Sequence, residues 1–105
     1  MALDAQGYPL PESLNAISTY DLMTKPLSGL IDLLRDTWWA PDWGFHLDKN
    51  DLELHTGGWS GNEDTIQALK ANTLFWALCW RRHDVGGHFY FLLKPYPGDS
   101  KPPTF

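Results

Sequence analysis

The chain has 105 residues, a formal net charge of -5 and an aromatic content of 14 %, which includes six tryptophans. This length holds one domain with a buried core and excludes an enzyme built from several lobes. The 13 acidic side chains outnumber the 8 Lys and Arg residues, which argues against a protein that binds duplex phosphates or an anionic membrane.

The N-terminal segment, residues 1–25, has a mixed composition that includes two prolines. Leu14 and Ile17 give residues 12–20 a modest helical pattern. We therefore expect an N-terminal arm that contains one short helix.

The next segment has a clearer helical pattern. Its apolar residues recur at i, i+3, i+4, i+7 and i+11 and form one face: Leu27, Leu30, Ile31, Leu34 and Trp38. Pro26 favours a helix start and Pro41 favours a stop. The spacing predicts a helix over residues 27–38.

Beyond Trp43 the pattern changes to alternation. The apolar positions are Phe45, Leu47, Leu52 and Leu54, and the polar positions between them are His46, Asp48, Asp51, Glu53 and His55. This alternation indicates a half-buried β-hairpin that turns through Lys49 and Asn50. When Leu47 faces Leu52, the apolar set points to the core and the polar set shares the opposite face.

A glycine-rich loop over residues 57–61 leads into a second helix, expected over residues 62–71. Ser60 and Glu63 match the capping box, in which each residue satisfies a backbone donor near the other. The apolar face is short, chiefly Ile66 and Leu69, so this helix must pack on the sheet to persist.

Residues 73–93 are rich in aromatic and long apolar side chains. We expect a second hairpin there, which turns at Val85 and Gly86 and pairs His83 with His88 and Trp80 with Phe91. Because both faces are apolar over most of their length, the pattern predicts a central hairpin that is covered on both sides.

Together these elements predict an α+β domain over residues 26–93. Two antiparallel hairpins form a mainly four-stranded sheet, and two helices pack on it. Residues 94–105 contain four prolines and are expected as an extended or disordered tail. Strand order and oligomeric state do not follow from the sequence.

The single cysteine, Cys79, excludes an internal disulfide. The first ten residues lack the basic region and apolar run of a signal peptide, and no stretch approaches the roughly 18 apolar residues needed to cross a bilayer. We therefore expect a soluble cytoplasmic protein without membrane contact, and the sequence indicates no cofactor.

The glycine loop resembles two known kinds of site, and its residues oppose both. No lysine follows the glycines, and Glu63 and Asp64 occupy the place where a bound phosphate would lie. The stretch around Ser60 differs from a nucleophile elbow because Asn62 replaces the last glycine. We interpret Ser60 as a helix cap.

The four histidines are candidate metal ligands: His46, His55, His83 and His88. His46 and His55 share the polar face of the first hairpin with three acidic residues, which also offer carboxylates for a hydrolase. No second pair at a recognised ligand spacing accompanies them. The alternative interpretation is a solvated sheet face and a polar hairpin tip.

The tryptophans divide by their positions. Three fall on apolar faces and are expected in the core: Trp38, Trp76 and Trp80. Trp39 and Trp43 flank a Pro-Asp turn, and Trp59 lies between glycines, so these three are candidates for a contact surface. The alternative is that they fold back over a small core.

Basic residues gather in one cluster, which comprises Arg81, Arg82, His83 and Lys94 and is flanked by Trp80 and Tyr90. Arginine next to aromatic residues is typical of a nucleic-acid stacking surface. It is equally typical of a protein–protein hot spot. The acidic balance of the whole chain favours a protein partner over nucleic acid.

The segment LELHTGGWSGNE, residues 52–63, together with Phe75-Trp76 and the later GGHFYF, residues 86–91, resembles small uncharacterised proteins encoded by tailed phages and prophages. The likeness covers roughly residues 38–91. It implies an accessory role in the cytoplasm of an infected bacterium, and it transfers no active site.

These observations favour a phage-encoded accessory protein that binds a host macromolecule, first of all a protein, as an inhibitor or modulator, for example of a defence system. The candidate contact residues are Trp39, Trp43, Trp59, Arg81, Arg82 and Tyr90. The alternatives are a small metal-dependent enzyme that uses the hairpin histidines and acids, and a phage assembly component.

Overall fold

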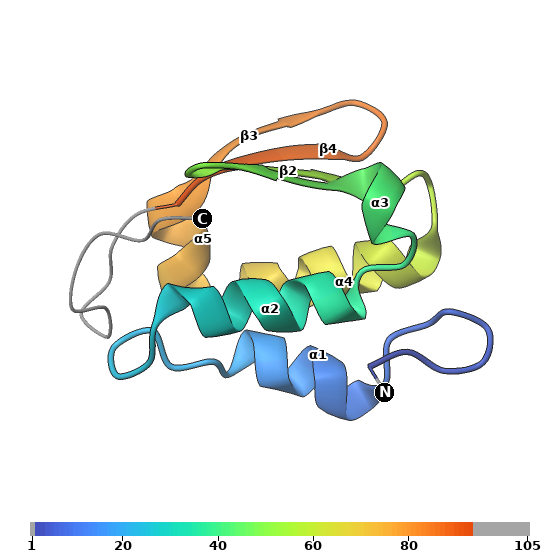
Figure 1. Cartoon of the computed structure of the whole chain (residues 1–105), viewed down its shortest axis with the longest axis horizontal. Helices are drawn as coiled ribbons and strands as arrows, with labels where there is room; N and C mark the ends of the chain where they lie inside the picture. The colour runs from blue at the N-terminus through green and yellow to red at the C-terminus, as the bar shows by residue number, and fades with distance from the viewer. Residues whose placement is uncertain (1, 94–105) are drawn as a thin grey trace.

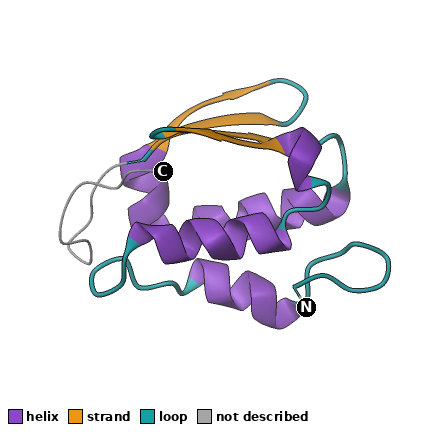
Figure 2. Ribbon diagram, in the orientation of Figure 1, coloured by secondary structure: helices purple, strands orange, loops and turns teal. Residues whose placement is uncertain are grey.

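A four-stranded antiparallel sheet lies over a layer of helices (Figure 1, Figure 2). This arrangement confirms the predicted α+β class. The computed structural model describes residues 2–93. The helices are α1 (Pro11–Ser18), α2 (Leu27–Thr37), α3 (Pro41–Gly44), α4 (Ser60–Ala71) and α5 (Thr73–Cys79), and the strands are β1 (Phe45–Asp48), β2 (Asp51–His55), β3 (Trp80–Asp84) and β4 (His88–Leu92).

The first hairpin has the predicted register. Leu47 pairs with Leu52 and Phe45 pairs with Leu54, so the apolar positions share one face. The strand order is β1-β2-β4-β3. The middle of the sheet is therefore formed by β2 and β4, while β1 and β3 are its two edges.

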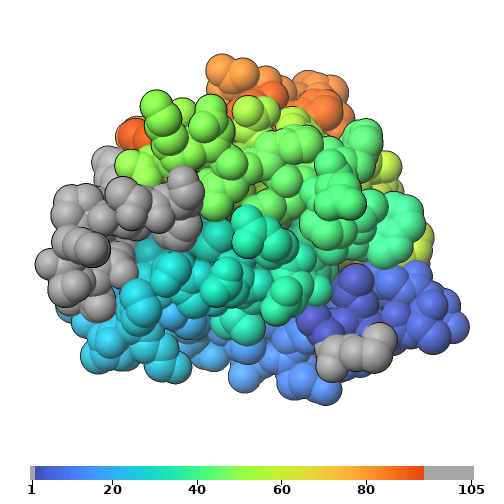
Figure 3. Space-filling model, viewed as in Figure 1, coloured from blue at the N-terminus to red at the C-terminus, as the bar shows by residue number. Residues whose placement is uncertain are grey.

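The hydrophobic core lies between the sheet and the helices. Residues 1–25, expected as an arm, contribute Ile17 and Leu22 to this core, and both are fully buried. The buried amide of Asn72 donates to the carbonyl oxygens of Ile17 and Tyr20, each at 3.0 Å. In Figure 3 the N-terminal residues, in blue, continue the surface of the molecule beside α2. The short helix predicted there is confirmed as α1.

The prediction of a strand from residue 73 is wrong, because residues 73–79 form helix α5. Nearly every residue of this run is apolar, so its pattern fits a strand and a helix equally well. Asn72 decides the outcome, since its side-chain oxygen accepts a hydrogen bond from Phe75 N and caps the helix. The burial pattern also fits a helix, because Phe75 and Cys79 lie one helical turn apart on the same face and are both buried.

The predicted turn of the second hairpin is one residue too short. Gly86 and Gly87 both have positive φ, so the turn includes both glycines and Asp84 pairs with His88. His83 pairs with Phe89 instead of His88. The predicted pairing of Trp80 with Phe91 is confirmed, because a register shift between Trp80 and Arg82 restores the alignment.

The second hairpin is not covered on both sides, contrary to the prediction. Helices lie against one face of the sheet (Figure 1), and all five residues of β3 are exposed. Trp80, expected in the core, is 40 % exposed, and Trp76 is half-buried against the core. The pattern misled because six apolar residues of the predicted hairpin belong to α5: Leu74, Phe75, Trp76, Ala77, Leu78 and Cys79.

The predicted capping box at Ser60 is also wrong. Helix α4 begins at Ser60 with Trp59 at the N-cap, and no side chain caps it. The Ser60 hydroxyl instead contacts the Tyr8 hydroxyl at 3.2 Å.

Within the described residues, no helix combines the length and the hydrophobicity that a bilayer crossing requires. The predicted tail, residues 94–105, lies outside the described residues.

Candidate functional site

A cleft of about 330 Å³ opens beside α3, at the end of the sheet where β2 finishes. Its lining is mainly apolar and comprises Trp39, Ala40, Trp43, Thr56, Gly57 and Asn62. Trp39 is 46 % exposed and Trp43 is 57 % exposed, although both indole rings are large and apolar. We call this feature the Trp39–Trp43 cleft.

The backbone that carries the two tryptophans is held in an uncommon conformation. Ala40, between Trp39 and α3, has a φ of 56° in the left-handed region, where a residue with a Cβ atom is strained. The buried side chain of Asn62 forms two hydrogen bonds with the backbone of Trp39, which we call the Asn62 clamp. Asn62 Oδ1 accepts from Trp39 N at 2.8 Å, and Asn62 Nδ2 donates to Trp39 O at 3.1 Å.

Both cleft tryptophans lie against a glycine. A Cβ atom built on Gly57 would lie 2.9 Å from the Trp43 ring, and one built on Gly7 would lie 2.6 Å from the Trp39 ring. Both glycines also have positive φ. Glycine is required at these positions because the rings occupy the space that a side chain would need.

Trp59, the third candidate from the sequence, supports the cleft from behind. Its ring packs between Tyr8, at 4.7 Å, and Trp39, at 5.3 Å between centroids. Its indole Nε1 donates to Gly7 O at 3.2 Å. Trp59 is therefore half-buried by the N-terminal segment and does not line the cleft itself.

Three of the four histidines lie next to one another on the open face of the sheet, beside Trp43. His55 Nδ1 and His88 Nδ1 are 2.7 Å apart, and the His46 and His55 ring centroids are 5.6 Å apart. His46 Nε2 lies 2.7 Å from Trp43 O, and the His55 ring meets the Trp43 ring edge at 6.3 Å. The histidines thus border the cleft.

Burial lowers the pKa of His55, and the nearby His88 adds to this effect. Glu53, whose carboxylate is 3.5 Å from His55 Nε2, opposes it. The hydrogen bond between the two Nδ1 atoms requires one ring to donate and the other to accept. One of the two rings therefore accepts through an unprotonated Nδ1.

His83 does not join this group, because it lies on the helix-covered face. Its ring stacks on Phe89 with centroids 4.0 Å apart. Among residues 2–93, no group of three or more His, Cys, Asp or Glu side chains is arranged to hold a metal ion.

The basic candidates lie elsewhere, on the free edge of the sheet at β3. The Arg82 guanidinium lies 4.2 Å from the Tyr90 ring centroid and 3.3 Å from the Asp84 carboxylate. Hydrogen bonding to Tyr90 and the charge of Asp84 raise the pKa of Arg82. Arg81 is exposed on the same edge. Tyr90 lies on the open face, with its ring centroid 6.2 Å from that of His55, and none of these residues lines the cleft.

Sequence reasoning found the two exposed tryptophans and missed the residues that position them. Asn62 was interpreted only through its place after Ser60, and Ala40 carries no pattern that predicts a left-handed conformation. Gly7 and Gly57 give a partial indication, since glycine is the usual residue where the backbone has a positive φ or lies close to another group.

The fold and the cleft together define a small α+β protein with one covered and one open sheet face and an aromatic cleft at the end of the open face. Comparison with known proteins gives no match to a protein-family model, to a curated protein or to a solved structure. The function is therefore argued from the site.

Proposed function

We propose that this chain is a binding protein that contacts a partner protein through the Trp39–Trp43 cleft and inhibits or modulates that partner. The resemblance of residues 38–91 to phage and prophage proteins supports a host protein in the bacterial cytoplasm as the partner.

The main support for this proposal is that Trp39 and Trp43 are exposed around a cleft. Burying an aromatic side chain stabilises a small domain by about 2 to 3 kcal/mol, yet these two rings face solvent. The Asn62 clamp and the strained Ala40 hold them there. Exposed tryptophans around a preformed apolar cleft are typical of protein-binding hot spots, because a partner desolvates them without further ordering.

The charges near the cleft favour a protein over nucleic acid. None of the residues that line the cleft is charged, whereas nucleic-acid sites require cations along the backbone path. The chain is acidic overall, with a net charge of -5. A phosphate backbone would be repelled, and an apolar side chain of a partner would be accepted.

Affinity capture from a lysate of a bacterium that harbours the gene tests the proposal. The immobilised full chain is expected to retain one discrete partner. Trp43→Ala should lose most of it, because a hot-spot tryptophan typically contributes about 2 kcal/mol or more. Trp80→Ala is the matched control, since Trp80 is similarly exposed at the opposite end of the sheet.

Equal loss of the partner in both variants would contradict the proposal, as would capture that neither variant changes. Stoichiometric zinc or manganese in the purified chain, with no partner retained, would favour the metal-dependent enzyme instead. Recovery of the chain in purified virions would favour an assembly component. Circular dichroism of both variants checks that each remains folded.

A further inference from the structure

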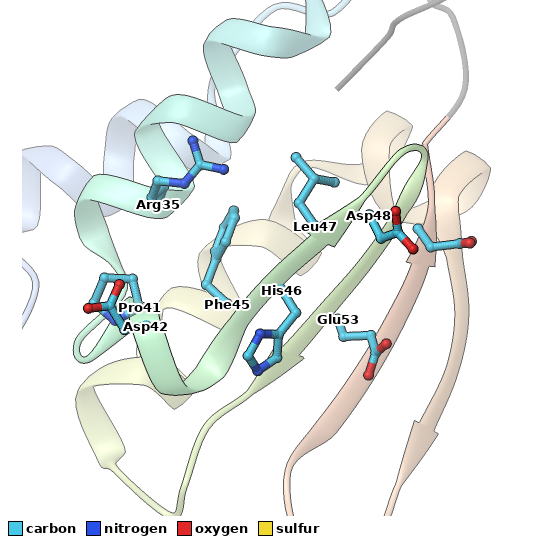
Figure 4. A pocket seen from close by; sticks show the side chains of 9 residues that line it. Arg35, Pro41, Asp42, Phe45, His46, Leu47, Asp48 and Glu53 are labelled. Carbon is cyan, nitrogen blue, oxygen red and sulfur yellow. The ribbon is translucent and has the colours of Figure 1, made fainter.

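Among residues 2–93, strand β1 is an edge of the sheet with no strand paired on its outer side. In an antiparallel pair, every second residue of an edge strand directs its backbone N–H and C=O groups away from its neighbour. A hollow of about 460 Å³ runs along this edge, between β1, the end of α2 and the start of α3 (Figure 4). An extended chain segment placed there would find unpaired backbone groups.

The hollow is acidic. Four carboxylates line it: Asp42, Asp48, Asp51 and Glu53. Arg35 is the one Lys or Arg side chain among the lining residues, and it lies 4.8 Å from the Phe45 ring centroid and 3.9 Å from the Asp32 carboxylate. The excess of negative charge favours a segment that carries Lys or Arg.

The two faces beside β1 differ in polarity. Phe45 and Leu47 project toward α2, whereas His46 and Glu53 lie on the open face (Figure 4). Leu47 is only half-buried, so apolar surface remains next to the edge. A strand added here would continue the alternation, with one set of side chains beside Leu47 and the other set beside the carboxylates.

A second copy of this chain fits the edge poorly. Two β1 edges would bring together two hollows that each carry four carboxylates and one arginine, and the excess negative charges would repel each other. The other edge, β3, has a register shift between Trp80 and Arg82, and a bulge of this kind discourages pairing between edges.

We propose that the β1 edge binds an extended segment of a partner protein in which Lys or Arg alternates with apolar residues, and that this segment joins the sheet as a fifth strand. The proposal rests on the proposed binding function for the existence of a protein partner. It concerns a different surface, because α3 separates the hollow from the Trp39–Trp43 cleft.

The probe is a short acetylated peptide that alternates lysine with valine, titrated into the isotope-labelled full chain. We expect amide shifts at residues 45–48 and little change along β3. Two matched peptides are the controls. One replaces lysine with glutamate and should not bind, and the other is N-methylated at each valine and should not bind because it cannot complete the strand pairing.

A charge reversal in the chain tests the electrostatic part. Asp48→Lys should weaken binding of the lysine peptide by up to about fivefold, the size of one exposed ion pair. Asp64→Lys gives the same change of net charge on exposed α4 and should leave the affinity unchanged. Both side chains are exposed, so neither substitution disturbs the core.

Three results would overturn the proposal: unshifted amides at residues 45–48, equal binding of the lysine and glutamate peptides, or concentration-dependent shifts of β1 without any peptide, which would indicate self-association. Trp43→Ala separates this proposal from the previous one. That variant should lose the captured partner and still bind the lysine peptide.

Discussion

The two ends of the sheet both expose tryptophan, and they do so in different ways. At one end Trp39 and Trp43 lie on a clamped backbone around an apolar cleft. At the other end Trp80 stacks on Trp76 at 6.1 Å, and Lys70 Nζ lies 5.5 Å from the Trp76 ring. The Trp76 and Trp80 rings pack against each other, whereas Trp39 and Trp43 line an open cleft. Exposure by itself is therefore a weak indication of a site, and the surroundings decide.

A buried asparagine lies near each of these regions: Asn62 beside the cleft and Asn72 at the start of α5. Asn72 joins α1 to the start of α5 through Ile17 O, Tyr20 O and Phe75 N. Asn72→Ala removes these three hydrogen bonds, two of which are buried, so we expect a loss of about 3 kcal/mol in the free energy of unfolding. Urea denaturation measures this loss. A change below about 1 kcal/mol would mean that the hydrogen bonds of Asn72 are not important for folding.

Asn62→Ala is expected to have a smaller effect on stability, about 2 kcal/mol, because two of its three bonds are only partly buried. Its specific consequence is local. Trp39 N loses its acceptor, so hydrogen exchange at this amide should accelerate more than global unfolding explains. Unchanged protection of the Trp39 amide would contradict the hydrogen bond from Trp39 N to Asn62 Oδ1.

How far the sequence predicts these features depends on how local their causes are. Alternation in residues 45–54 predicted the first hairpin with its register, because a period of two fixes which side chains share a face. The helix over residues 27–38 followed from its apolar spacing. These elements depend on patterns that a few neighbouring residues contain.

Features that depend on distant contacts were not predictable. Helix α5 is capped by Asn72, whose side chain also reaches α1, and no local pattern distinguishes it from a strand. Trp38 and Trp39 are adjacent in sequence, yet Trp38 is 1 % exposed and Trp39 is 46 % exposed. Their difference depends on Asn62, 23 residues further along the chain. The tryptophans of the site were predicted, but their support was not.

Gly57→Ala should cost about 1 to 2 kcal/mol, because φ is positive at Gly57 and the Trp43 ring fills the space for a Cβ atom. Gly58→Ala is the matched control. It has the same sign of φ with no heavy atom within 4 Å of the added carbon. The difference between their unfolding free energies isolates the Trp43 contact, and equal losses would show that this contact contributes nothing.

The smallest predicted effect is a pH dependence that arises at His55. Its pKa is lowered in the folded state, so the unfolded chain binds this proton more strongly. The lowered pKa therefore has no effect on stability above the unfolded-state pKa of about 6.5. Below it, the free energy of unfolding decreases as the pH falls toward the folded-state pKa. Unfolding free energies at about pH 7.5 and about pH 5 measure it. His55→Asn should show a weaker pH dependence, and an unchanged dependence would assign it to other groups.

The proposed function requires that the Trp39–Trp43 cleft contacts the partner while the Trp76–Trp80 pair does not. The most direct test observes the indole N–H resonances of the isotope-labelled chain while the captured partner is added. We predict that the Trp39 and Trp43 resonances shift or broaden and that the Trp80 resonance stays in place. Perturbation of Trp80 with unchanged Trp39 and Trp43 would contradict the claim.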